Sequence, residues 1–233
     1  MNINNPNNLI KITHNPYILN DLQIKKHKSN SDTSKVGTKN TLPEGLIETL
    51  RQWEENDKLE NEKPVMWDLA KIPLKYFISN GSNFEGYLED FEKVICSCFL
   101  EWARASFGLI RFIKTNYQDD SDIVIKWSDT VVLGRKYESG HSNLALIGNR
   151  INNAEITIVV YPIIDKLSPE INRIERVKRT MLHEIGHSLG LKHSNNPKDI
   201  MFSRSIKNKQ ISETDSQKLL EIYNSKSPNK FNL

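Results

Sequence analysis

Three histidines and a glutamate near the C-terminus have the residue types and spacing of a metal site with a base beside it. His183 and His187 are four residues apart. On a helix, that spacing stacks two imidazoles on one face, about one turn apart, so both can hold one ion from the same side. Gly190 lets the chain leave the helix and turn back, which brings His193 towards the same ion. Three neutral imidazoles leave a fourth tetrahedral position for water, the arrangement of a catalytic zinc site.

Glu184 is the candidate catalytic base of this site. It directly follows the first histidine, so it projects about a quarter-turn away from the ligand face of the helix. From there its carboxylate can accept a proton from an attacking water and pass it to a leaving amine. Zinc lowers the pKa of a bound water to about 7 and polarises a scissile carbonyl. The pattern therefore predicts one catalytic Zn²⁺ and hydrolysis of peptide bonds.

Two interpretations without catalysis compete with this one. The histidines could be unrelated surface residues at a helix end, but five fixed residue types at fixed spacing make a chance match rare. A zinc site that has lost its activity is the stronger alternative, and the presence of Glu184 argues against it.

A methionine follows the histidine motif after a polar turn. Met201, in the run Asp199-Ile200-Met201, would by itself be assigned to the core. After the histidines it resembles the methionine turn beneath the metal of the metzincin peptidases. Ser194, after the third histidine, narrows the resemblance to the matrixins, the matrix-metalloproteinase-like family.

The resemblance covers about residues 64–223, and its specific part is residues 183–201. It implies a mixed sheet of about five strands, three helices and an active-site cleft that holds the zinc, with Gly190 and Met201 in structural roles. A substrate peptide would lie along an edge strand. Residues 143–147 match that edge by position, although an ordinary core strand fits them equally well.

The chain also departs from the family. Animal matrixins usually carry a second, structural zinc, but the corresponding region offers only His141, which we expect to be a loop residue. An acidic turn offers carboxylates for Ca²⁺, although a solvated turn is the simpler interpretation; its residues are Asp119, Asp120 and Asp122. No cysteine precedes Cys96, so thiol-based latency is not supported. The N-terminal segment remains a candidate to occlude the cleft by other means.

Hydrophobic periodicity independently predicts an α+β fold built on a mixed sheet. The predicted strands are residues 72–79, 109–113, 122–127, 143–147 and 155–161. The predicted helices are residues 83–105, a second helix with Ser168 as N-cap and Pro169 in its first turn, and residues 213–223 with Ser212 as N-cap. Between the strands, residues 134–140 are expected to form a polar loop.

The chain of 233 residues is expected to divide into three parts. Residues 1–63 are polar and predict an extension that is largely disordered, with one short helix at about 43–62. Residues 64–227 form the predicted catalytic domain, and residues 228–233 a flexible tail. Cys96 and Cys98 are two apart on a predicted helix and point to different sides, so we expect no disulfide between them.

Composition limits the partners. The net charge is +3, from 32 basic and 29 acidic residues, so nucleic acid is not an expected partner. No apolar run is long enough for a membrane span. The N-terminus lacks the uncharged apolar core of a secretory signal, which predicts a protein kept in the cytoplasm or exported by another route. We expect a monomer that acts on peptides or proteins. The alternatives are a non-catalytic zinc protein that binds a peptide or partner, and a hydrolase of another amide or ester.

Overall fold

The computed structural model describes residues 10–14, 64–129, 139–160, 172–203, 208 and 210–224. These residues all belong to one compact unit. The short helix predicted at about residues 43–62 and the flexible tail at 228–233 lie outside the described residues, so those expectations stay predictions. In the described part, no helix is both long and apolar enough to cross a membrane.

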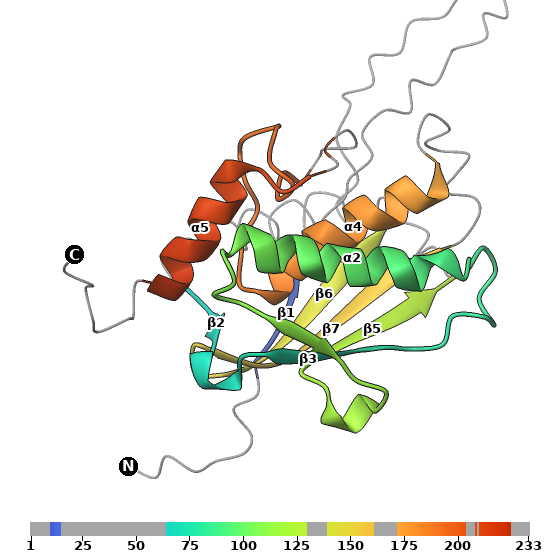
Figure 1. Cartoon of the computed structure of the whole chain (residues 1–233), viewed down its shortest axis with the longest axis horizontal. Helices are drawn as coiled ribbons and strands as arrows, with labels where there is room; N and C mark the ends of the chain where they lie inside the picture. The colour runs from blue at the N-terminus through green and yellow to red at the C-terminus, as the bar shows by residue number, and fades with distance from the viewer. Residues whose placement is uncertain are drawn as a thin grey trace, which may run out of the picture. The chain divides into compact units, whose positions relative to one another are not determined.

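A mixed sheet of seven strands forms the base of the fold (Figure 1). The strands are β1 (Ile10–His14), β2 (Met66–Trp67), β3 (Leu74–Ile78), β4 (Phe112–Lys114), β5 (Ile123–Ser128), β6 (Gly140–Ile147) and β7 (Arg150–Val159). Six of them follow the order β1-β6-β7-β5-β3-β4, and β2 pairs with β7. Strand β6 is antiparallel to both of its neighbours, and every other pairing is parallel. The predicted mixed sheet is confirmed, with β1 and the short β2 beyond the strands expected.

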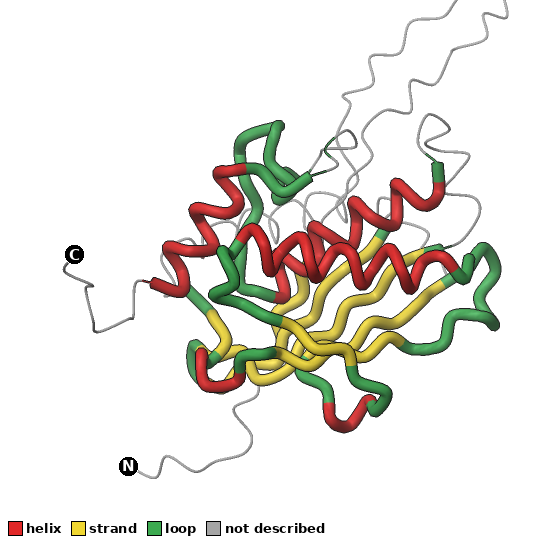
Figure 2. Tube along the Cα trace, in the orientation of Figure 1, coloured by secondary structure: helices red, strands yellow, loops and turns green. Residues whose placement is uncertain are grey.

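In the described residues, three α-helices accompany the sheet, as expected. They are α2 (Asp90–Ala105), α4 (Arg173–Ser188) and α5 (Glu213–Asn224), and two short 3₁₀ helices, η2 (Leu69–Lys71) and η3 (Gln118–Asp120), lie in loops. Figure 2 shows α2 and α4 along one face of the sheet. A hydrogen bond joins these two helices, because the Trp102 indole Nε1 donates to the carbonyl of Leu182 at 2.8 Å.

The core lies between α2, α4 and the sheet. Phe91, Ile95, Phe99 and Trp102 form the buried face of α2, and the ring of Phe99 stacks on Tyr76 of β3 with centroids 3.9 Å apart. These aromatic side chains of α2 therefore pack in the core.

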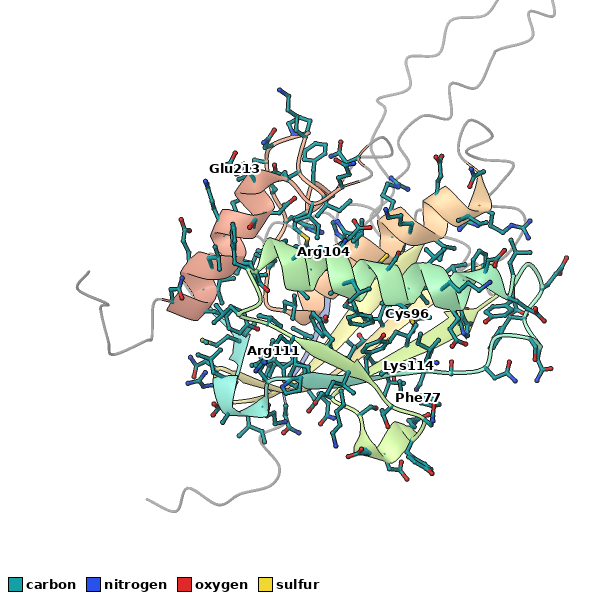
Figure 3. All side chains as sticks on the ribbon, viewed as in Figure 1. Phe77, Cys96, Arg104, Arg111, Lys114 and Glu213 are labelled. Atoms are coloured by element: carbon teal, nitrogen blue, oxygen red, sulfur yellow. The ribbon has the colours of Figure 1, made fainter. Side chains whose placement is uncertain are left out.

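The two cysteines of α2 are free thiols, as expected. Cys98 is buried and its pKa is raised by desolvation. Figure 3 shows Cys96 and, below it in this view, Lys114 of β4.

Some predicted boundaries were wrong. Helix α2 begins at Asp90 rather than at residue 83, because Gly86 adopts a φ of +89° that a right-handed helix does not contain. Strand β4 begins at Phe112 rather than at residue 109, where the second predicted strand starts. His141 lies inside β6 rather than in a loop.

The second long helix, α4, begins later than its predicted cap. It starts at Arg173, and its N-cap is Asn172, whose side chain accepts a hydrogen bond from the Glu175 amide at 2.8 Å. Ser168 and Pro169 lie outside the described residues, as does most of the polar loop expected at residues 134–140. The prediction of Ser212 as N-cap of the last helix is confirmed, because its Oγ accepts from the Asp215 amide at 3.0 Å.

Candidate metal centre

The end of α4 and the turn after it position the three histidines. Helix α4 ends at Ser188, and Gly190 follows with a φ of +96°. The amide of Leu191 donates to the carbonyl of Gly186, and the amide of Gly190 to that of His187, at 3.0 and 2.9 Å. These two bonds are the Schellman pattern that closes a helix with a left-handed residue. The chain therefore reverses immediately after the second histidine.

This reversal gathers the three imidazoles. His183, His187 and His193 each offer one nitrogen, and these atoms all lie within 4.8 Å of one another. The Nε2 atoms of His183 and His187 are 3.0 Å apart. The first two histidines are buried and His193 is exposed, so the cluster opens towards solvent on one side. In the described part of the chain, no other such group of histidine, cysteine or acidic side chains is found.

Backbone carbonyls orient the two buried rings. His183 Nδ1 lies 2.7 Å from the carbonyl oxygen of Ile200, and His187 Nδ1 lies 2.8 Å from that of Leu191. A carbonyl can only accept, so each Nδ1 carries the proton and each Nε2 presents a lone pair. Two lone pairs facing each other fit a cation held between them.

The spacing of these atoms also suits zinc. Zn–N bonds of about 2.0–2.1 Å in a tetrahedron place ligand nitrogens ~3.3 Å apart. The observed Nε2 separation of 3.0 Å is close to that value. Metal-binding histidines generally donate their other N–H to a carbonyl or carboxylate, as both buried rings do here. The residues present therefore fit a zinc ion.

Glu184 lies buried between the helix and the sheet. Its side chain is fully buried, and Ser142 of β6 donates a hydrogen bond to its Oε2 at 2.6 Å. The same hydroxyl also lies 3.0 Å from the backbone carbonyl of Glu184. Ser142 therefore fixes the carboxylate relative to the histidines. Sequence reasoning missed Ser142, because it is 42 residues away in the chain and has no local motif.

Met201 packs directly against α4. It is fully buried, and a Cβ built on Gly186 would lie only 2.3 Å from its Sδ. A side chain at residue 186 would therefore displace the methionine. Gly186 lies on the helix that carries His183 and His187, and the placement of Met201 beneath a bound metal stays a prediction.

Asp215 holds the backbone of the methionine turn. This buried carboxylate of α5 accepts from the amides of Ile200 and Met201 at 2.8 and 3.3 Å. It also accepts from the amide of Ser212 at 2.9 Å, which completes a reciprocal capping box. Because the Ile200 carbonyl in turn orients His183, a chain of contacts runs from α5 to the histidine cluster. The Ser212–Asp215 spacing was visible in the sequence, but the contacts of Asp215 with Ile200 and Met201 were not.

A second buried carboxylate, Asp199, fastens the loop after His193. It accepts from the hydroxyls of Ser194 and Ser212 and from the side-chain Nδ2 of Asn196. The Ser194 amide also donates to the Met201 carbonyl at 2.8 Å. The serine that narrowed the family resemblance therefore ties the third histidine's loop to the methionine turn.

Two lysines contact the carboxylates of the acidic turn at η3. Lys75 Nζ lies 2.7 Å from Asp120, and its backbone amide donates to Asp122 at 2.8 Å. Lys71 Nζ lies 3.7 Å from Asp122, while Asp119 is exposed. These contacts favour the solvated turn, and nothing in the described residues supports calcium. His141 is likewise apart from the histidine cluster, and burial lowers its pKa, while Glu155 opposes that shift.

The fold and the site together define the class of this protein. A helix covers the mixed sheet, and its last turn and the loop after it present three histidines. A glutamate and a buried methionine lie beside them. Comparison with protein families agrees, because the sequence model of the matrixins matches residues 66–224. The chain belongs to the matrixin family of metzincins. No curated protein matches the chain.

Proposed function

We propose that this protein is a zinc-dependent metalloendopeptidase, with one ion held by His183, His187 and His193 and with Glu184 as general base. The observation that carries the proposal is the cluster of three histidines, two of them oriented by backbone carbonyls. Membership of the matrixin family supports the same reaction. Gly190 and Met201 act structurally, by reversing the chain and by filling the space beneath the cluster.

Each residue has a distinct task in this proposal. Bound zinc would polarise the scissile carbonyl and lower the pKa of a water to about 7. Glu184 accepts the proton of the attacking water and then donates it to the leaving amine. Ser142, through its 2.6 Å hydrogen bond, holds the carboxylate of Glu184 in one orientation. The exposed face of His193 leaves the site accessible to a peptide.

Replacing Glu184 tests this assignment. In Glu184→Gln, the three histidines are intact, so we expect about one zinc per chain by elemental analysis and a loss of peptide cleavage of about 10²–10⁴-fold. Glu221→Gln makes the same chemical change at an exposed position of α5 and should leave both values unchanged. Cleavage by Glu184→Gln at the wild-type rate would refute Glu184 as the base. Zinc binding without cleavage by the wild-type chain would favour a peptide-binding protein instead.

A further inference from the structure

The α2–β4 turn, residues 104–111, has a phenylalanine where its backbone favours glycine. The amide of Gly108 donates to the carbonyl of Ala103 at 2.9 Å, and the amide of Phe107 donates to that of Arg104 at 2.9 Å. These two bonds are the Schellman pattern, in which the left-handed residue is usually glycine. Phe107 occupies that position with a φ of +51°. A side chain there strains the backbone, because its Cβ approaches the following carbonyl oxygen.

Packing does not compensate for this strain. The side chain of Phe107 is 83 % exposed, the highest value among the exposed large hydrophobic residues of the described part. The turn is open to solvent, because a Cβ added at Gly108 would meet no atom within 4 Å. It is also rigid, because the buried Ser106 hydroxyl accepts from the Ile110 amide at 3.1 Å and donates to the Ala103 carbonyl at 2.9 Å. A strained residue whose side chain stays in solvent indicates a function beyond the fold.

Two arginines bracket this phenylalanine. Arg104 lies in the last turn of α2 and Arg111 lies just before β4, and both are exposed. Figure 3 labels both of them, together with the exposed Glu213 of α5. Within the described residues, neither arginine forms an ion pair, and Glu213 accepts from Gln217 of its own helix at 3.5 Å. The α2–β4 turn therefore combines an exposed aromatic ring with uncompensated positive charge.

The size and charge of this surface favour a lipid bilayer over a protein partner. A stable protein interface buries about 800 Å² on each side, whereas a phenylalanine side chain offers about 150–250 Å². Leu100, one helical turn before Arg104 and 58 % exposed, adds only a second small contact. Insertion of an aromatic side chain at a bilayer surface, with cations at the level of anionic headgroups, needs no larger area.

We propose that the α2–β4 turn docks the protein on an anionic lipid surface, with Phe107 inserted between the lipids and with Arg104 and Arg111 bound to the headgroups. A glycine at residue 107 would form the same turn without strain but could not insert, so the contact with lipid accounts for the phenylalanine. Attachment through one aromatic ring and two cations is reversible and weakens as salt rises. The inference concerns where the protein acts and is independent of the proposed peptidase reaction.

Vesicle binding by the full chain tests the inference. Vesicles of phosphatidylcholine with about 30 mol % phosphatidylserine would be compared with vesicles of phosphatidylcholine alone, and bound protein would be measured by flotation. We expect wild type to bind the anionic vesicles, to bind the neutral ones at least tenfold more weakly, and to dissociate as salt is added. No binding of wild type to the anionic vesicles would overturn the proposal.

Phe107→Gly separates docking from folding. Because glycine suits the left-handed position, the unfolding temperature should not fall, whereas binding to anionic vesicles should fall about tenfold or more. Tyr117→Gly is the matched control, since it removes another aromatic side chain, 74 % exposed, outside the α2–β4 turn. It should leave vesicle binding unchanged. Equal binding by wild type and Phe107→Gly would overturn the proposal.

A pair of double variants tests the arginines. Arg104→Gln/Arg111→Gln should weaken binding to the anionic vesicles at least tenfold. Lys93→Gln/Lys126→Gln removes the same net charge from two lysines that form ion pairs elsewhere, at 3.1 and 2.6 Å, and should bind nearly as wild type does. Equal losses in the two double variants would mean that overall charge drives binding, and would overturn the assignment to this turn.

Phe107→Trp reports whether the side chain enters the bilayer. Tryptophan suits the bilayer interface, so this variant should bind at least as well as wild type, and lipids brominated in the acyl chains should quench its added fluorescence. The tryptophans of the described residues are buried, at Trp67, Trp102 and Trp127, so they should be quenched much less. No added quenching in vesicle-bound Phe107→Trp would overturn the proposal.

Sedimentation without lipid tests the remaining occupant, a second copy of the chain. We expect wild type and Phe107→Gly to sediment alike. Dimers of wild type that Phe107→Gly does not form would assign the α2–β4 turn to a contact between copies and would overturn lipid docking.

Discussion

At the residue scale, the hydroxyl of Ser142 positions the carboxylate of Glu184. Ser142 donates to its Oε2 at 2.6 Å, and both residues are fully buried. In the described residues, both hydrogen bonds of the Ser142 hydroxyl go to Glu184, one to its side chain and one to its backbone carbonyl. Its contribution is therefore the orientation of Glu184 and not the binding of metal.

This role predicts a specific kinetic effect for Ser142→Ala. Removing the hydroxyl leaves the histidines untouched, so zinc content should stay at about one per chain. Because only the orientation of the base is lost, kcat should fall about tenfold with KM nearly unchanged. Steady-state kinetics on a cleaved peptide checks this, with Ser82→Ala, an exposed serine, as control. A rise in KM at constant kcat would instead assign Ser142 to substrate binding.

The buried Asp215 supports a second prediction at this scale. In Asp215→Asn, an NH2 group that cannot accept a hydrogen bond replaces one carboxylate oxygen. One backbone donor among Ile200, Met201 and Ser212 therefore loses its partner. We expect the free energy of unfolding to fall by about 1–3 kcal/mol. Since Ile200 orients His183, zinc affinity should also fall about 10–100-fold.

Urea denaturation and competition with a fluorescent chelator measure the two effects of Asp215→Asn. The control is Asp119→Asn, the same change in an exposed carboxylate. Zinc affinity equal to wild type in Asp215→Asn would break the proposed link from α5 to the histidine.

The sequence identified the three histidines and Glu184 more readily than the residues that hold them in place. The histidines and Glu184 share one helix and its turn, so fixed spacing makes them visible as a motif. Ser142 and Asp215 reach the site across 42 and 14 residues of chain. Those contacts depend on how the strand and the last helix pack, which no local pattern encodes.

At the element scale, the turn after α4 requires glycine for two separate reasons. Gly190 has a φ of +96°, and a Cβ there would lie 2.1 Å from the carbonyl oxygen of Val65. The positive φ would strain the backbone of any other residue, and a Cβ would collide with the segment that leads into β2. The turn is thus fixed against the sheet as well as by its own hydrogen bonds.

Gly190→Ala should therefore destabilise more than an ordinary left-handed glycine. Gly148 also has a positive φ, +61°, but nothing lies within 4 Å of its Cβ position, so Gly148→Ala isolates the strain. We expect about 1–2 kcal/mol for Gly148→Ala and a clearly larger loss, with reduced zinc affinity, for Gly190→Ala. Thermal unfolding of both variants checks this. Equal losses would mean that the contact with Val65 is accommodated without cost.

Element types followed from the sequence, whereas several ends did not. Residues 122–127 were predicted to form a strand, and in β5 (Ile123–Ser128) every second side chain is buried. In contrast, the apolar repeat of α2 continues back through Leu88 and Phe84. The pattern therefore hid the turn at Gly86, whose positive φ is a property of the backbone and not of hydrophobicity.

At the scale of the whole molecule, the N-terminal strand was beyond sequence prediction. Residues 10–14 lie in a polar region and pair with β6, far away in the chain. Pairing between distant strands leaves no local signal, because its register depends on an edge that exists only in the folded domain. The expectation from the sequence that the N-terminal segment covers the cleft stays a prediction.

The most direct test of the proposed function is zinc-dependent cleavage by the full chain. Wild type and Glu184→Gln, each with about one zinc per chain, would be incubated with a pool of unmodified peptides, and new termini would be identified by mass spectrometry. We predict internal cleavage by wild type that a chelator abolishes and added Zn²⁺ restores, and a loss of cleavage in Glu184→Gln. If zinc-loaded wild type cuts no peptide, the protein is not a peptidase and its histidine cluster serves binding alone.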